Sequence, residues 1–152
     1  MNLTDIRTIK DIMSIYNIHF RKEFGQNFLT NISVVEDIAD MCCDYGARES
    51  TILEIGPGIG TLTRELCTRY KQVLALEIDR GLIPALSYTL DEFKNVTVVN
   101  EDVMKADLDA LLAPYFEAGS VSVCANLPYY ITTPILMKLL ESRLPFDTIT
   151  VM

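Results

Sequence analysis

The sequence of 152 residues lacks the patterns that mark membrane, secreted or metal-binding proteins. No apolar run approaches the roughly 20 residues of a membrane-spanning helix, and the first residues alternate charged with apolar side chains, unlike a secretory signal. The four cysteines include no CxxC pair, and the single histidine, His19, has no cysteine at metal-ligand spacing. We therefore expect a cytoplasmic protein that binds neither membrane nor metal, with its cysteines buried as small hydrophobic residues.

Positive charge is also scarce. There are 13 basic and 21 acidic residues, which give a net charge of −8 and an isoelectric point of about 4.6. This balance argues against a broad nucleic-acid-binding surface. Residues 1–30 differ, with four basic against three acidic side chains. If a polyanion binds this chain, the N-terminal arm is the favoured place.

The apolar pattern predicts a single α/β domain. Hydrophobic residues make up 49% of the chain and charged residues 22%, as in a globular domain with an ample core. Short apolar runs alternate with segments of helical periodicity, which specifies a parallel sheet with helices on both faces. The expected strands are 51–55, 72–78, 96–100, 121–125 and 147–152. Because the chain ends inside the fifth expected strand, we interpret it as the first part of a longer protein.

Residues 1–50 precede the first expected strand and are predicted to hold an N-terminal helix, a flap loop and a capping helix. Residues 51–152 would form the ligand-binding core. Apolar side chains at helical spacing predict the first helix, opened by Thr4 and Asp5. Residues 19–31 show no period and mix basic with aromatic side chains. This composition fits either a flap over a ligand or a connecting loop anchored by its aromatic rings.

Two further helix starts are predicted from capping signals. Ser33 and Glu36 have the S-x-x-E spacing of a capping box, so Ser33 is the expected cap of the second helix. Thr133 followed by Pro134 predicts the cap and the first position of the last helix.

The stretch LEIGPGIG, residues 53–60, ends the first expected strand in three glycines spaced two apart. Gly56, Gly58 and Gly60 remove side chains where a backbone turns tightly and approaches a ligand closely. Residues 61–70 then place apolar side chains on one helix face. Strand, glycine turn and helix predict a nucleotide pocket at the carboxyl end of the strand, although the turn only resembles the dinucleotide motif.

Acidic residues end the next two expected strands. Glu77 can accept hydrogen bonds from both ribose hydroxyls of an adenosine-type ligand. Asp102 has the reach to accept one from the exocyclic amine of an adenine. Each is also compatible with a plain structural role, as a solvated strand end or a helix cap. A nicotinamide-dependent oxidoreductase would share the glycine turn and Glu77, so that class stays open at this point.

The segment NLPY, Asn126 to Tyr129, favours chemistry on a nucleobase amine. Such an amine is a poor nucleophile because its lone pair is delocalised into the ring. The side-chain oxygen of Asn126 and the carbonyl of Leu127 can accept both amine hydrogens and make the nitrogen more tetrahedral, while Pro128 stiffens the turn. Tyr129 offers a flat face for a base taken out of its stack. The structural alternative is a tight strand-to-helix turn with a packing tyrosine.

Five stretches resemble the ribosomal RNA adenine dimethyltransferase family, which includes bacterial small-subunit dimethyladenosine transferases, macrolide-resistance methylases and mitochondrial transcription factor B proteins. They are FGQNFL at 24–29, LEIGPGIGTLT at 53–63, ALEIDR at 75–80, EDVMK at 101–105 and ANLPYYITTPI at 125–135. They span essentially the whole chain after the first helix. The resemblance implies a Rossmann-like class I methyltransferase fold, truncated after about strand five, with S-adenosylmethionine as cofactor.

The resemblance also implies roles for individual residues. The expected cofactor-contacting positions are Asn27, Leu29, Gly56, Gly58, Glu77, Asp102 and Asn126. Asn27 and Leu29 would close over the cofactor, and Asn126 would lie where methyl group and target amine meet. The expected catalytic segment is Asn126, Leu127, Pro128 and Tyr129. Tyr130 departs from the asparagine found in many relatives, which concerns only secondary contacts to the target.

For the complete protein, the resemblance implies dimethylation of two adjacent adenosines near the 3′ end of small-subunit ribosomal RNA. The family's helical RNA-binding domain has no counterpart in these 152 residues. Binding of the ribosomal small subunit would therefore depend mainly on a further segment. Two alternatives remain: a cofactor-binding domain without turnover, and a resistance-type methylase that acts on large-subunit RNA.

Overall fold

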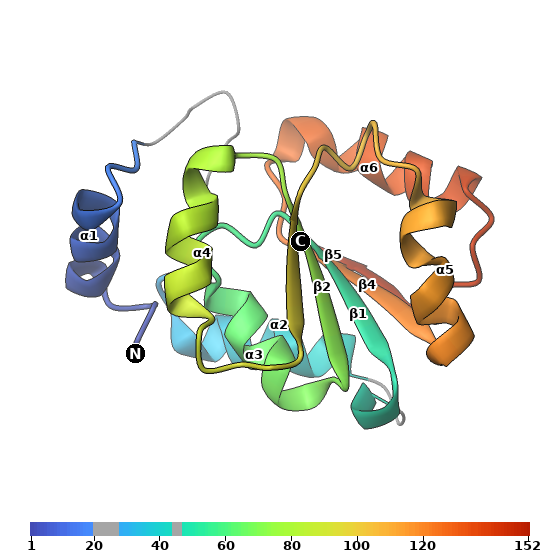
Figure 1. The fold of residues 1–152 in the computed structure, drawn as a ribbon, viewed down its shortest axis with the longest axis horizontal. Coiled ribbons are helices and arrows are strands. Elements are labelled where there is room, and N and C mark those ends of the chain that lie inside the picture. The colour runs from blue at the N-terminus through green and yellow to red at the C-terminus, as the bar shows by residue number, and fades with distance from the viewer. Residues whose placement is uncertain (20–27, 44–46) are drawn as a thin grey trace.

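The computed structural model describes residues 1–19, 28–43 and 47–152, and within them a five-stranded parallel sheet of order β3-β2-β1-β4-β5 (Figure 1). The strands are β1 (Thr51–Ile55), β2 (Gln72–Glu77), β3 (Val96–Asn100), β4 (Val121–Ala125) and β5 (Ile149–Val151). The helices are α1 (Ile6–Ile15), α2 (Ile32–Cys42), α3 (Thr61–Arg69), α4 (Ile83–Thr89), α5 (Leu108–Ala118) and α6 (Tyr129–Glu141), with short 3₁₀ turns η2 (Ala47–Glu49) and η3 (Arg80–Leu82). The predicted parallel α/β fold is confirmed.

The sheet is covered on both faces because each central strand divides its side chains between two cores. In β1, Leu53 and Ile55 pack with α5 and α6, whereas Ile52 packs with α2 and α3. In β4, Cys124 faces α2 while its neighbours face the opposite core. Every residue of β1 and β4 is buried, as expected for central parallel strands. A third core joins α1 to α4, at the β3 side of the sheet (Figure 1).

Two predicted helix starts are wrong. Helix α2 is capped by Asn31, whose side chain accepts a hydrogen bond from the Ser33 amide at 3.0 Å, so Ser33 lies inside the helix. Asparagine caps a helix as well as serine does, and here it comes first along the chain. Helix α6 begins at Tyr129, just after Pro128, and contains Pro134 in its interior. The helix thus tolerates one missing backbone donor rather than starting later.

The fold requires a glycine at position 60. Gly60 is the N-cap of α3 with φ of +91°, in the left-handed region, and a Cβ there would lie 3.1 Å from Thr89 Oγ1 and 3.3 Å from Leu90 Cδ2. Thr89 cannot easily yield, because it is buried and its hydroxyl donates to the Ile59 carbonyl at 2.8 Å. Both backbone strain and crowding therefore oppose any side chain at this position.

We expect Gly60→Ala to lower the free energy of unfolding by about 3 kcal/mol, which combines left-handed strain with overpacking. Gly56→Ala is the matched control, because Gly56 also has positive φ, at +74°, but its added Cβ would meet Leu127 Cδ2 only at 3.9 Å. The control should lose about 1 kcal/mol from strain alone. Urea unfolding of the two variants measures the difference, and equal losses would rule out crowding at Gly60.

Candidate active site

A cavity of about 290 Å³ lies at the carboxyl ends of the central strands. It is bordered by the turns that follow β1, β2, β3 and β4, next to the point where the strand order reverses between β1 and β4. Open parallel sheets bind their ligands at this kind of position. The predicted site residues that line the cavity are Leu29, Gly56, Gly58, Glu77, Asp102, Asn126, Leu127 and Pro128. The predicted contact at Asn27 lies outside the described residues.

The glycine turn forms one side of the cavity. Gly56 and Gly58 have φ of +74° and +62°, values that residues with a Cβ rarely adopt. The Gly56 amide donates to the Leu76 carbonyl at 2.9 Å, which ties the turn to β2. The ring of Phe28 lies so close that a Cβ on Gly58 would be 3.6 Å from it. Phe28 thus covers the glycine turn, and both Phe28 and Leu29 line the cavity.

Glu77 joins the ends of β1 and β2. Its carboxylate is 4% exposed and accepts two backbone hydrogen bonds, from Gly58 at 3.1 Å and from Asp79 at 2.8 Å. Burial outweighs these bonds and raises the pKa of Glu77 to about 7. Since a carboxylate has about four acceptor positions, Glu77 keeps capacity to accept from a ligand. Glu77 therefore organises the turn as well as lining the cavity, a role that the sequence interpretation did not include.

Asp102 holds the turn after β3. Its Oδ1 accepts a hydrogen bond from the Met104 amide at 2.9 Å, and the residue is half-buried at the cavity wall. The second carboxylate oxygen is a further acceptor. Asp102 thus lies where the sequence placed it, at a strand end that opens on the same cavity as Glu77.

The NLPY segment closes the cavity from the β4 side. The Leu127 amide donates to the Met152 carbonyl at 3.0 Å and the Met152 amide donates to the Ala125 carbonyl at 2.9 Å, so the end of the chain braces the turn. Asn126 and Pro128 are half-buried, and Leu127 is buried. Tyr129 does not line the cavity, and its side chain is 94% exposed. It lies between Pro128 and Tyr130, which do line it.

Among the cavity residues that sequence reasoning missed, Glu54 is the most deeply buried carboxyl. This side chain in β1 is 2% exposed, and burial raises its pKa to about 8. Glu54 Oε2 and Thr63 Oγ1 are both buried, and neither has a hydrogen-bond partner among the described residues. The available signal was the charged residue inside an apolar strand, because a buried carboxyl in a cleft is a common mark of a functional site.

The cavity is acidic. Four of its side chains are carboxyls, those of Glu54, Glu77, Glu101 and Asp102, and none of the described lining residues is lysine, arginine or histidine. Near neutral pH Glu54 mostly holds its proton, because burial raises its pKa to about 8, so the negative charge of the cavity comes from the carboxyls that are ionised. This charge opposes phosphate groups and favours a ligand with positive charge. Among the described residues, no three His, Cys, Asp or Glu side chains are arranged so that they could hold a metal ion. In the same part of the chain, no helix is long and apolar enough to cross a membrane.

Comparison with known proteins identifies the family of this chain. The family model described as "Ribosomal RNA adenine dimethylase" matches residues 17–152. Two curated relatives are both named "Ribosomal RNA small subunit methyltransferase A". The relative from Ligilactobacillus salivarius is 51% identical over 93% of this chain and 47% of its own length. The relative from Bacillus licheniformis is 49% identical over 98% of this chain and 50% of its own length. The chain thus spans about half the length of these relatives.

Solved structures share the fold. The 23S rRNA methyltransferase ErmE superposes with a TM-score of 0.65 and 31% identity, over 82% of this chain and 45% of that one. A dimethyladenosine transferase from Plasmodium falciparum gives a TM-score of 0.60 and 26% identity, over 80% of this chain and 41% of that one. The predicted Rossmann-like methyltransferase fold is therefore confirmed. The chain belongs to the ribosomal RNA adenine dimethylase family.

Proposed function

We propose that this chain is the cofactor-binding and catalytic part of an S-adenosylmethionine-dependent methyltransferase. In complete form, the enzyme dimethylates two adjacent adenosines of small-subunit ribosomal RNA in the cytoplasm. The observation that carries the proposal is an acidic cavity of about 290 Å³ that opens against the NLPY turn. The small subunit is favoured over the large one because the relatives near 50% identity are named for it.

The cofactor residues fit an adenosine with a charged tail. Glu77 would accept hydrogen bonds from the ribose hydroxyls and Asp102 one from the adenine amine, while Leu29 covers the ligand. S-adenosylmethionine would supply a methyl group on a positively charged sulfur. That charge suits the ionised carboxyls of the cavity, whereas the pyrophosphate of a nicotinamide dinucleotide would be repelled by them. This contrast favours the methyltransferase over the oxidoreductase.

The NLPY turn would receive the target base. Tyr129, almost fully exposed beside the cavity, is available for stacking by an adenine turned out of the RNA. The Asn126 oxygen and the Leu127 carbonyl would accept the two amine hydrogens, which directs the nitrogen lone pair toward the methyl group. In-line transfer then depends mainly on positioning. No strong base is needed, because the proton can leave after transfer begins.

Calorimetry with S-adenosylmethionine and with NADH tests the cofactor assignment on the 152-residue chain. We expect binding of the first alone, and binding that strengthens from pH 6 to pH 8, because the ionised form of Glu77, whose pKa is about 7, is the better acceptor. Glu77→Gln should weaken binding about tenfold and flatten this pH dependence, as expected for loss of a charged acceptor. Glu117→Gln, on the exposed side of α5, is the matched control.

Labelled S-adenosylmethionine with undermethylated small subunits then separates catalysis from mere cofactor binding. Incorporation into small-subunit RNA supports the complete proposal. Cofactor binding without incorporation by any longer form of the protein would leave a binding domain, and binding of NADH alone would revive the oxidoreductase. Incorporation into large-subunit RNA would show the resistance-type activity instead.

A further inference from the structure

Two buried cysteines from distant parts of the chain meet between α2 and β4. Cys42 is the last residue of α2 and Cys124 lies in β4, and their Sγ atoms are 3.0 Å apart. Both side chains are fully buried and both thiols are free. A disulfide has its sulfur atoms about 2 Å apart, so a movement of about 1 Å would join this pair.

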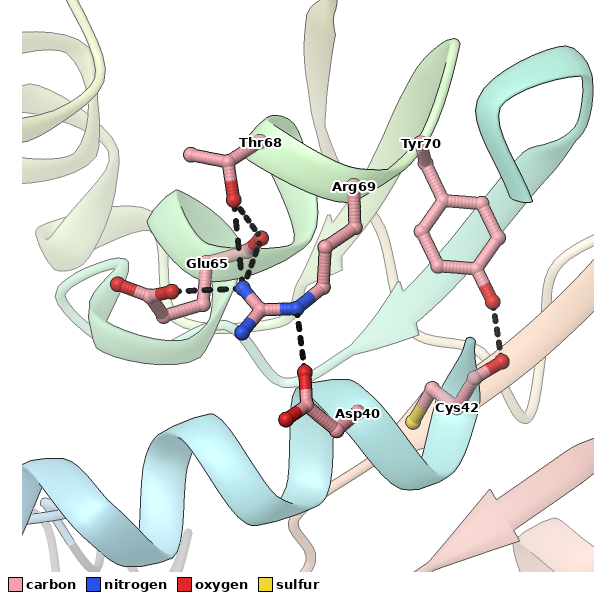
Figure 2. Close-up of polar contacts among 6 residues, drawn as sticks. All are labelled: Asp40, Cys42, Glu65, Thr68, Arg69 and Tyr70. Atoms are coloured by element: carbon pink, nitrogen blue, oxygen red, sulfur yellow. Dashed lines mark hydrogen bonds and ion pairs between the residues drawn. The ribbon is translucent and has the colours of Figure 1, made fainter. Parts of the chain in front are cut away.

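The end of α2 is fixed in place from the α3 side. Figure 2 shows the Tyr70 hydroxyl donating to the Cys42 carbonyl, and Arg69 Nε donating to Asp40 Oδ1 at 2.9 Å. Arg69 also pairs with Glu65 at 2.6 Å, so the same guanidinium links two helices. These contacts hold the backbone of Cys42, and its thiol therefore has a defined position beneath β4.

The pair is also electronically asymmetric. The hydrogen bond with Cys124 lowers the pKa of Cys42, whereas the same contact and burial raise the pKa of Cys124. The thiolate is the reactive form of cysteine, and the hydrogen bond between the two thiols stabilises a thiolate within the pair. Because both side chains are fully buried, only a small oxidant that enters the protein can reach them. Cys67 provides the contrast: it is buried beside Glu54, and burial raises its pKa to about 12.

We propose that Cys42 and Cys124 are a peroxide-reactive dithiol site that closes to an intramolecular disulfide between α2 and β4. In the first step, the Cys42 sulfur attacks one oxygen of hydrogen peroxide, the O–O bond breaks, and a sulfenic acid and water form. In the second step, the Cys124 sulfur displaces hydroxide from this sulfenic acid, which leaves as water with the Cys124 proton. Overall, two thiols lose two hydrogens while one peroxide becomes two waters.

A disulfide between Cys42 and Cys124 would connect residues that lie 82 apart in sequence. Helix α2 follows the segment of Phe28 and Leu29, and β4 leads directly into Asn126, so the bond would link two elements whose adjoining segments line the cavity. Closing so long a loop should raise the melting temperature by about 10 °C if the native geometry accepts the bond.

Treatment of the reduced 152-residue chain with hydrogen peroxide tests the site. We expect an intact-mass loss of about 2 Da without dimer formation, a Cys42–Cys124 cross-linked peptide, the higher melting temperature, and reversal by dithiothreitol. Cys124→Ser and, separately, Cys42→Ser should abolish the cross-link. Cys67→Ser is the matched control, because Cys67 is a buried thiol that has no sulfur hydrogen-bond partner among the described residues, and this variant should behave as the unchanged chain.

Three results would overturn the proposal. One is a mass loss that persists in Cys124→Ser. Another is a mapped bond between Cys42 and Cys43, which Cys43→Ser would remove. The third is slow overoxidation of single thiols at the rate of Cys67, which would show that proximity confers no reactivity. Thiol content and peptide mapping report on the site without any dependence on methyl transfer.

Discussion

Replacement of Asn126 by alanine is expected to lower methyl transfer to undermethylated small subunits by at least about 100-fold, comparable to removal of one preorganised polar group from an active site. Affinity for S-adenosylmethionine should fall no more than about tenfold. The reason is that the amide oxygen would accept from the target amine mainly as the nitrogen becomes tetrahedral. Labelled methyl incorporation and cofactor calorimetry measure the two effects separately.

This assay requires the longer protein that the length of the relatives leads us to expect. Tyr129 supplies the control pair, because Tyr129→Phe keeps the exposed ring whereas Tyr129→Ala removes it. The phenylalanine variant should retain nearly full activity, and the alanine variant should bind RNA more weakly, by about 1–3 kcal/mol for one lost stacking contact. Equal incorporation by Asn126→Ala and the unchanged protein would remove Asn126 from the mechanism.

The second large effect is expected from Glu54, as a dependence of stability on pH. Burial raises the pKa of this carboxyl from 4.5 to about 8. Below about pH 4.5 the folded and unfolded chains both hold the proton. Between pH 4.5 and 8 only the folded chain holds it, so the free energy of unfolding falls as pH rises. The loss from Glu54 should be on the order of 4 kcal/mol across this range.

Glu54→Gln should therefore remove most of this slope when unfolding in urea is followed from pH 5 to pH 8.5 without cofactor. The remaining slope of the same sign would come from Glu77, whose raised pKa of about 7 acts over a narrower range. Glu117→Gln, at an exposed position, should leave the slope unchanged. Parallel pH profiles for Glu54→Gln and the unchanged chain would mean that Glu54 is already ionised in the folded state.

Most of the fold could be predicted because the strands are short apolar runs with clear ends. The run 51–55 ends at Gly56, and 121–125 ends at Asn126, so both boundaries match the structure. Helix starts failed where two capping signals lie within a few residues, as with Asn31 and Ser33. Which of two candidate residues becomes the cap depends on where the preceding segment ends and the helical conformation begins. The local sequence does not determine that point.

The site was predictable to the extent that polar residues follow strand ends. Glu77, Asp102 and Asn126 could be placed together because parallel strands bring their carboxyl ends to one edge. Glu54 could not, because it lies within a strand and its orientation depends on which core each face of β1 meets. Tyr129 is exposed and is the first residue of α6. The cap signal before Pro134 predicted a later start of this helix and so obscured the position of Tyr129.

The strand order also has a consequence for how the site assembles. Strands β1, β2 and β3 are consecutive in the chain, so the glycine turn, Glu77 and Asp102 come from pairings between near neighbours. The pairing of β1 with β4 joins Thr51 to Val121, far apart in sequence, and such contacts form slowly in folding. We expect the wall that carries Asn126 to be added late. A ligand that needs both walls would then select fully folded chains and shift the folding equilibrium toward them.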